Sequence, residues 1–341
     1  MNKESNFERL QTILSGKKPD RASYVEYWYV NQAVVETVLG RKLPPLGWYE
    51  DAISAPDNFE FSRKIGMDAV TTDWIYRPGH VSGVSETGDM HYAGGTIRNR
   101  KDFEEKMAPA PDLSWVREKA AAHAALRRSS STGVIHTLTG VLDPAYLAMG
   151  MENFMLLLYD DPQLVNDMLD HFLHAGLAAM EEICAFDEID IICINDDVCT
   201  GTGPIVSPAM MKDLWYPRIK KLIELPKARG KIITYHSDGK LEPILPWLHE
   251  LGFQAAHPVE PYANDIYALK KTWGQKLCLM GNIDITLLRF GKPDEIRKDV
   301  RTHLEKLGPK RYIVSSSNSL IQDIPPENFL AMTETVREFI W

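Results

Sequence analysis

Cysteine is scarce in this chain, and basic residues are outnumbered by acidic ones. The 341 residues include four cysteines, a count and spacing that fit a reduced chain better than a disulfide framework. Lys and Arg number 38 against 47 Asp and Glu, which gives a net charge of −9. Nucleic acids and anionic membranes select for clustered positive charge, so we expect neither as a partner.

Long apolar runs are missing as well. No stretch approaches the ~18 consecutive apolar residues that a membrane-spanning helix requires. The N-terminal segment MNKESNFERLQTIL is charged and amphipathic, and it lacks the apolar region of a secretory signal. With 44% hydrophobic and 25% charged residues, the composition is that of an ordinary globular protein. We therefore expect a cytoplasmic protein with a single domain over residues 1–341.

The pattern that is present is an alternation of short β-rich runs with longer amphipathic stretches. The candidate strands are Ala22–Tyr27, Asp68–Thr72, Val134–Thr139, Ile189–Asn195, Lys231–His236, Phe253–His257, Leu277–Gly281 and Tyr312–Ser316. The clearest helical stretches are Asp161–Cys184, Ser207–Arg229, Pro293–Leu307 and Pro325–Phe339. Near-continuous apolar strands are typical of a parallel sheet buried on both faces. The alternation predicts an α/β protein with a (β/α)8 TIM barrel.

Two further features bear on this fold class. The stretch His80–Arg98 alternates polar and apolar residues around glycines, which predicts a β-hairpin inserted after the second strand. A doubly wound open sheet is the alternative architecture. It is disfavoured because no GxGxxG motif follows an early strand.

Polar residues follow every predicted strand, at the barrel end where catalytic groups lie. They are Glu26, Asn31 and Gln32, then Asp73, His136 and Thr139, Asn195–Asp197, His236–Asp238, His257 and Glu260, Asn282 and Asp284, and Ser315–Asn318. Capping of the following helix explains any single one of them about as well as a functional role does. Taken together, they mark the catalytic candidates Asp73, Asp196 and Asp197, and the cofactor-contact candidates Asn282, Ser316 and Asn318.

His236 and Asp238 are the most informative of these residues. They are two positions apart at a strand end and therefore point to the same side. Such a pair suits a divalent metal, an acid/base role or a buried structural hydrogen bond. Glu260 follows on the next strand, flanked by Pro258 and Pro261, which make its segment rigid. We take His236, Asp238 and Glu260 as candidate metal ligands.

Aromatic residues gather after the first two strands. Tyr27, Trp28 and Tyr29 follow the first, and Trp74 follows the second. They either pack the barrel mouth against the predicted hairpin or line a pocket for a flat, largely apolar ligand. With His136, they are the candidate substrate-binding residues.

Several motifs, in this order, resemble those of the uroporphyrinogen decarboxylase superfamily over nearly the whole chain. They are Glu8-Arg9-Leu10 with Gly16–Arg21, Asp196-Asp197 with Gly203-Pro204 and Ser207-Pro208, His236–Gly239, Pro258–Pro261, Gly281–Asp284 and Pro325–Asn328. The resemblance implies a (β/α)8 barrel. It also implies one of two activities: cofactor-free decarboxylation of a tetrapyrrole acid, or zinc-dependent methyl transfer involving corrinoid proteins or thiols.

The resemblance is stronger to the methyltransferase branch. The Arg- and Gly-rich segment with which the decarboxylase meets its polycarboxylate substrate is replaced by Val25–Gln32. The methyltransferases hold zinc on a His-x-Cys motif, with a further Cys near the last strand. Here Asp238 replaces the Cys, and Ser315–Asn318 occupies the late region. Glu260 stands where the related cobalamin-independent methionine synthase has a ligating Glu.

An oxygen-rich zinc site suits polarisation of an ether or alcohol oxygen better than activation of a thiol. The resemblance therefore implies a methyltransferase that moves a methyl group from an O-methyl donor, such as a methoxylated aromatic, to a corrinoid protein. A partner would supply the corrinoid, because no DxHxxG segment is present. The alternatives are a decarboxylase-like lyase that uses Asp73 or Asp196, and a non-catalytic binding protein.

Overall fold

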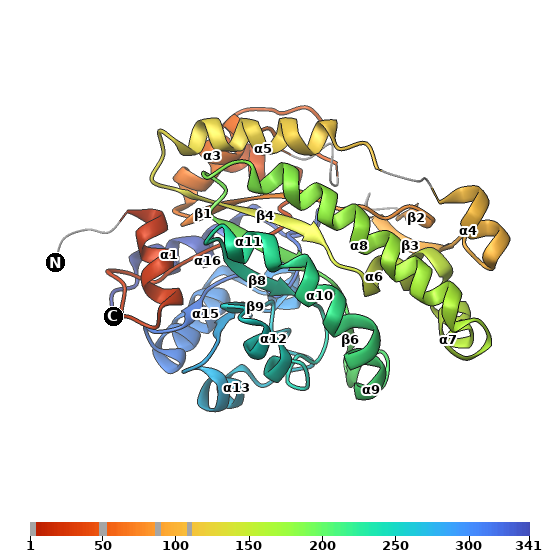
Figure 1. Cartoon of the computed structure of the whole chain (residues 1–341). Coiled ribbons are helices and arrows are strands. Elements are labelled where there is room, and N and C mark those ends of the chain that lie inside the picture. The colour runs from red at the N-terminus through yellow and green to blue at the C-terminus, as the bar shows by residue number, and fades with distance from the viewer. Residues whose placement is uncertain (1–4, 48–52, 86–89, 108–110) are drawn as a thin grey trace.

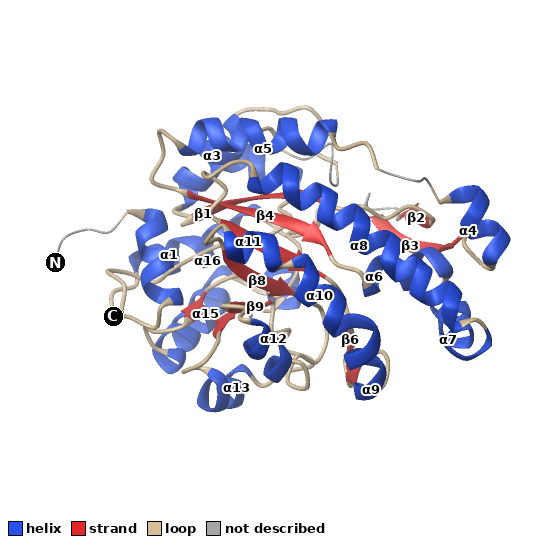
Figure 2. Ribbon diagram, viewed as in Figure 1, coloured by secondary structure: helices blue, strands red, loops and turns tan. Residues whose placement is uncertain are grey.

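A curled parallel sheet forms the centre of the molecule, and helices cover its outer face (Figures 1 and 2). The computed structural model describes residues 5–47, 53–85, 90–107 and 111–341. The sheet has seven strands in the order β1-β4-β5-β8-β9-β10-β11, and every neighbouring pair is parallel. They are β1 (Ala69–Trp74), β4 (Gly133–Thr139), β5 (Ile191–Asn195), β8 (Ile232–His236), β9 (Ala255–His257), β10 (Cys278–Met280) and β11 (Tyr312–Ile313). All seven fall within or close to strands expected from the sequence.

The first expected strand, Ala22–Tyr27, does not form a strand of this sheet. It provides a single parallel bridge, from Tyr24 to Val314. On its other side, the carbonyl of Tyr24 accepts a 2.9 Å hydrogen bond from the N–H of Asp68, just before β1. Both edges of the sheet thus meet this segment, which is why the sheet curls. The extended path ends at Trp28, whose φ is 44°.

A buried ion network holds this segment in place. Asp68 accepts hydrogen bonds from Arg9 at 2.7 Å, Arg21 at 2.9 Å and Ser23 at 2.7 Å. Arg9 also pairs with Asp20. Asp20 and Arg21, at the end of the Gly16–Arg21 motif, therefore have a structural role, because they anchor the segment that joins the two sheet edges.

Helices α1 to α3 precede β1, α16 follows β11, and most of the others lie between successive strands of the sheet. The first half contains α1 (Asn6–Leu14), α2 (Gln32–Leu39), α3 (Ala55–Ile65), α4 (Arg100–Lys106), α5 (Ser114–Arg127), α6 (Leu142–Met149), α7 (Met151–Asp160) and α8 (Pro162–Cys184). The second half contains α9 (Pro208–Met210), the π-helical turn η2 (Met211–Trp215), α10 (Tyr216–Leu222), α11 (Glu224–Ala228), α12 (Leu245–Leu251), α13 (Ile266–Trp273), α14 (Ile285–Phe290), α15 (Pro293–Leu307) and α16 (Pro326–Glu338). Among the described residues, no helix is both long and apolar enough to cross a bilayer.

The prediction of one continuous helix over Ser207–Arg229 was wrong. The stretch Ser207–Arg229 is divided into α9, η2, α10 and α11. Pro217 and Pro226 lie inside it, and proline has no N–H to donate to the preceding turn. The chain consequently passes through a wider π-helical turn just before Pro217.

An antiparallel pair of short strands lies between β1 and α4. It consists of β2 (His80–Val84) and β3 (Met90–Gly95), in the range where the sequence predicts a hairpin. Residues 86–89, which connect them, lie outside the described residues. A second short antiparallel pair, β6 (Cys199–Thr200) with β7 (Gly203–Pro204), follows β5.

Side chains alternate between two cores along each strand. Ala69 and Ile135 belong to a cluster inside the curl, whereas Val134, Leu138 and Trp74 belong to the larger cluster toward the helices. Since His136 lies between Val134 and Leu138 in this alternation, its side chain also faces the helices.

Candidate functional site

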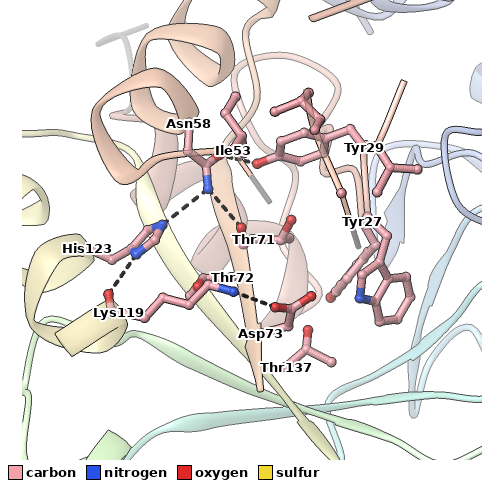
Figure 3. A pocket seen from close by; sticks show the side chains of 14 residues that line it. Tyr27, Tyr29, Ile53, Asn58, Thr71, Thr72, Asp73, Lys119, His123 and Thr137 are labelled. Atoms are coloured by element: carbon pink, nitrogen blue, oxygen red, sulfur yellow. Dashed lines mark hydrogen bonds and ion pairs between the residues drawn. The ribbon is translucent and has the colours of Figure 1, made fainter. Parts of the chain in front are cut away.

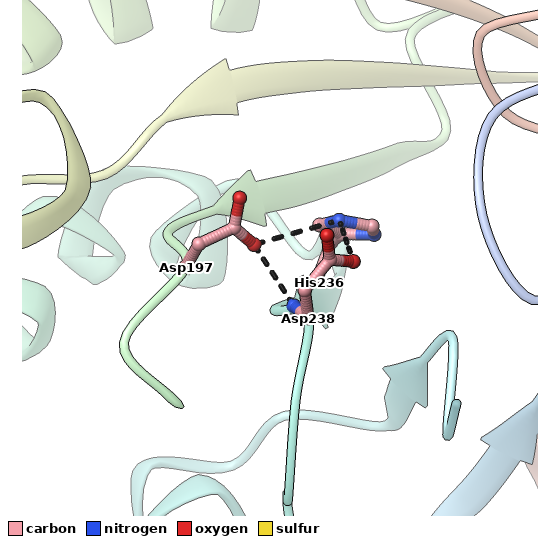
Figure 4. Close-up of side chains that lie close together, drawn as sticks. All are labelled: Asp197, His236 and Asp238. Atoms are coloured by element: carbon pink, nitrogen blue, oxygen red, sulfur yellow. Dashed lines mark hydrogen bonds and ion pairs between the residues drawn. The ribbon is translucent and has the colours of Figure 1, made fainter. Parts of the chain in front are cut away.

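Three side chains of types that can bind a metal ion converge at the C-terminal end of two neighbouring strands (Figure 4). They are called the metal-ligating group below. Asn195 of β5 lies opposite His236 of β8, so Asp197 and Asp238 each follow two residues beyond a paired position. Nε2 of His236 lies 3.5 Å from Oδ1 of Asp238 and 3.7 Å from Oδ1 of Asp197. One ligand atom from each of the three lies within 4.8 Å of the others.

The electrostatics of this group favour a bound cation. Desolvation and the nearby charge of Asp238 raise the pKa of Asp197 to about 8. Burial alone would lower the pKa of His236, but its hydrogen bond to Asp238 and the charge of Asp197 outweigh burial and raise that pKa. A divalent ion would relieve the repulsion between the two carboxylates. One imidazole nitrogen and two carboxylates form a donor set that fits zinc.

Glu260, the third expected ligand, lies beside this group and not within it. Its Oε2 accepts a 2.6 Å hydrogen bond from the N–H of Gly239. The side-chain amide of Asn318 joins the two acidic residues, with Nδ2 3.2 Å from Asp238 Oδ2 and 3.4 Å from Glu260 Oε1. The third member of the group is therefore Asp197 and not Glu260. Asp197 is one of the catalytic candidates expected from the sequence.

Asp196 lies apart from the site, although it is adjacent to Asp197 in sequence. Its carboxylate accepts hydrogen bonds from the backbone N–H groups of Val141, Leu142 and Asp143 at the start of α6, and from the indole of Trp215. Four protein donors satisfy this carboxylate, so the structure gives Asp196 an anchoring role in place of the predicted catalytic one.

The remaining cofactor-contact candidates act on neighbouring segments. Asn282 donates a 2.9 Å hydrogen bond to the carbonyl of Val259, in the loop that carries Glu260. Ser316 donates a 2.5 Å hydrogen bond to the buried Glu26. Of the three candidates, Asn318 is the one that touches the ligand group.

Figure 3 shows a pocket whose lining includes the aromatic residues Tyr27 and Tyr29. Its described lining includes Tyr27, Trp28, Tyr29, Asn58, Asp73 and Lys119. The Trp28 ring also packs edge-on against His236, with 4.6 Å between ring centroids. Trp28 therefore forms a wall that the pocket and the ligand group share.

The polar part of the pocket is an ion pair. Nζ of Lys119 lies 2.7 Å from Oδ1 of Asp73, and both side chains are largely buried. Burial lowers the pKa of the nearby His123 to about 4, so that imidazole is neutral at physiological pH. Asp73 thus lines the pocket, and its catalytic role stays a prediction. The other two expected contacts, His136 and Trp74, lie outside it on the helix-facing side of the sheet, because side chains alternate along β4 and β1.

No role was assigned from the sequence to Lys119, which lines the pocket, or to Glu26, which accepts a hydrogen bond from Ser316. Lys119 lies on α5, where a lysine in an amphipathic helix resembles any solvated residue. Glu26 is fully buried, and burial raises its pKa to about 7. The one available signal for Glu26 was a carboxylate inside the otherwise apolar and aromatic run Val25–Tyr29.

Comparisons with known proteins agree with this architecture. The family model "Uroporphyrinogen decarboxylase (URO-D)" matches residues 86–339. The structure is similar to a methyltransferase from Methanosarcina mazei, with a TM-score of 0.72 and 17% identity over 98% of this chain and 99% of that one. It is also similar to a B12-independent methionine synthase from Shewanella sp. W3-18-1, with a TM-score of 0.53 and 15% identity over 82% of this chain and 86% of that one.

A search of curated protein sequences gives no match. Both structures are at most 17% identical to this chain in sequence, so their similarity shows the fold alone. The family model covers well over half of the chain, and the matched range includes Asp197, His236 and Asp238. The chain belongs to the uroporphyrinogen decarboxylase family.

Proposed function

We propose that this protein is a methyltransferase that moves a methyl group from an O-methyl donor, such as a methoxylated aromatic, to the cobalt of a corrinoid on a separate protein. The single observation that carries the proposal is the shared wall between the aromatic pocket and the metal-ligating group. Trp28 lines the pocket and packs against His236 at 4.6 Å. A donor ring in the pocket could thus present its methoxy group toward Asp197, His236 and Asp238.

Asp197, His236 and Asp238 would hold the metal, which we propose to be zinc. When bound, a divalent ion supplies Lewis acidity at the oxygen that keeps the electron pair of the broken C–O bond. The two carboxylates balance the charge of the ion, and His236 supplies the nitrogen ligand. Asn318 keeps Asp238 oriented by donating to its carboxylate at 3.2 Å.

The aromatic residues would bind and orient the donor. Stacking against Trp28 holds a flat ring, while the Asp73–Lys119 pair at 2.7 Å offers hydrogen-bonding groups to its polar substituents. Fixing the donor in one orientation keeps its methyl carbon aligned with the approaching nucleophile, which lowers the entropic part of the barrier. The methyl group leaves without its bonding pair, and the nucleophile supplies the pair for the new bond.

Membership of the family and likeness in fold to a methyltransferase support this reading. A decarboxylase-like lyase is the second candidate, favoured by the position of Asp73 at the pocket. A polycarboxylate substrate would need several cationic partners. Among the described lining residues, Lys119 is the cation, and it already pairs with Asp73.

The direct test mixes the zinc-loaded protein with reduced cobalamin and a panel of methoxylated aromatics, and follows the cobalt spectrum. Methyl-cobalt formation with at least one donor, absent in Asp238→Asn, is the expected result. No methyl-cobalt formation across the panel, together with release of carbon dioxide from a carboxylated substrate, would replace the proposal with the lyase.

A further inference from the structure

A buried line of hydrogen bonds leads away from the candidate metal ligand His236. Its Nδ1 lies 2.7 Å from Nδ1 of His257, the residue opposite it on β9. Nε2 of His257 lies 3.1 Å from Oγ of Ser315, and that hydroxyl donates to Oε1 of Glu26 at 3.4 Å. All four residues are at most 4% exposed, so water does not compete for these hydrogen bonds.

The proton on the first hydrogen bond decides whether His236 can bind a metal. Only one of the two facing Nδ1 atoms can carry the proton, because a hydrogen bond needs one donor and one acceptor. If His236 carries it, Nε2 of His236 has a free lone pair that faces Asp197 and Asp238. If His257 carries it, a neutral His236 is protonated on Nε2 and cannot coordinate a metal through that atom.

Glu26 favours the first of these arrangements. Its Oε2 is an acceptor for the backbone N–H of Ser316 at 3.3 Å and lies 3.0 Å from the Tyr24 hydroxyl. An acceptor at Glu26 directs the Ser315 proton toward the carboxylate. The Ser315 oxygen then accepts a hydrogen bond from Nε2–H of His257, which leaves Nδ1 of His257 unprotonated to accept a hydrogen bond from His236. All three hydrogen bonds run in one direction, from His236 to Glu26.

We propose that Glu26 is a positioning residue that acts through Ser315 and His257 to hold His236 in the tautomer with an open Nε2. This inference rests on the metal site proposed above. Outer partners of a metal-ligating histidine typically contribute about 10–100-fold to metal affinity. In this protein the partner is remote, because two intervening side chains transmit its effect.

The primary test needs no metal. Long-range ¹H–¹⁵N NMR of the histidine side chains in metal-free protein at pH 8 reports which ring nitrogen carries each proton. The expected result is Nδ1–H on His236 and Nε2–H on His257. Finding His236 with its proton on Nε2 would overturn the inference whether or not the protein binds zinc.

The second test uses three matched serine variants and titration with Zn²⁺. Ser315→Ala breaks the line, and we expect about a 10–100-fold loss of zinc affinity together with a change in the His236 tautomer. Ser315→Thr keeps the hydroxyl and should restore both. Ser317→Ala is the control, because Ser317 accepts from the N–H of Ile285 at 3.0 Å and takes no part in the line.

These outcomes separate the inference from the proposed function. Unchanged zinc affinity and unchanged tautomers in Ser315→Ala would contradict the role of Glu26 while leaving the metal site intact. A wild-type protein that shows the expected tautomers but binds no zinc would support the hydrogen-bond line and contradict the proposed metal.

Discussion

The backbone N–H of Asp238 donates a 2.9 Å hydrogen bond to Oδ1 of Asp197. The turn that carries one candidate ligand is therefore tied to the side chain of another, across two neighbouring strands. This contact keeps both carboxylates close to His236 despite their mutual repulsion.

The same substitution should lower zinc affinity at Asp197 and the free energy of unfolding at the adjacent Asp196. Asp197→Asn removes a ligand, and we expect zinc affinity to fall by more than the ~10–100-fold typical of outer partners. Asp196→Asn weakens a buried hydrogen-bond network, and we expect it to lower the free energy of unfolding by about 2–4 kcal/mol. Zinc titration and urea denaturation of both variants provide the comparison. Equal effects of the two variants on zinc affinity would contradict their assigned roles.

Glu26 makes the stability of the protein depend on pH. Its pKa is raised from 4.5 to about 7, so folding takes up a proton between these values. The contribution of Glu26 to stability is accordingly most favourable below about pH 4.5 and declines as the pH rises through 7. The difference between 4.5 and about 7 corresponds to a change of roughly 3 kcal/mol in the free energy of unfolding.

Glu26→Gln removes this titration. Urea denaturation at pH 5 and pH 8 measures the free energy of unfolding of both proteins. We expect this free energy, in the variant relative to the wild type, to rise by a few kcal/mol from pH 5 to pH 8. A difference between the two proteins that is the same at both pH values would mean that Glu26 has no raised pKa in the folded protein.

The turn after His236 depends on a glycine. Gly239 has φ +84°, and a Cβ atom there would lie 2.5 Å from the carbonyl oxygen of Thr200. We expect Gly239→Ala to displace Asp238 and to weaken zinc binding without removing a ligand. Gly230→Ala is the matched control, because Gly230 also has positive φ, +69°, but has no atom within 4 Å of the added Cβ. Similar zinc affinities in the two variants would show that close packing at Gly239 does not position the site.

Substitution of Trp28 should weaken binding of the methyl donor and leave metal binding unchanged. Trp28→Leu removes the ring that the pocket shares with His236, and we expect KM for a methoxylated aromatic to rise about tenfold or more, with zinc content unchanged. Steady-state kinetics with metal analysis of the same sample provides the measurement. Loss of zinc from this variant would instead assign Trp28 to support of the metal site.

The sequence predicted the parts of the fold and site that depend on local pattern. Seven strands and the helices α8, α15 and α16 follow from apolar runs and end signals that each segment carries by itself. His236 and Asp238 could be paired in advance because residues two apart on a strand point to the same side. Glu260 was chosen because it follows the next strand between two prolines, and the family resemblance agreed with that choice. Neither feature fixes which carboxylate approaches His236 most closely.

What could not be predicted depends on distant contacts. Asp196 and Asp197 are adjacent residues of the same type, so the sequence does not tell them apart. The position of α6 decides which of them accepts the hydrogen bonds from its backbone N–H groups. The link from His236 to Glu26 joins residues 210 positions apart through two other segments. The break in Ser207–Arg229 is the exception, since its two internal prolines were visible in the sequence.

We propose above that Asp197, His236 and Asp238 bind one divalent metal ion. The most direct measurement is the zinc content and affinity of protein purified without chelator, beside Asp238→Asn and His236→Ala. We expect one zinc per wild-type chain and loss of that zinc from both variants, with the fold retained. Substoichiometric zinc in a wild-type protein that cannot be filled by titration, or an unchanged affinity in both variants, would contradict it.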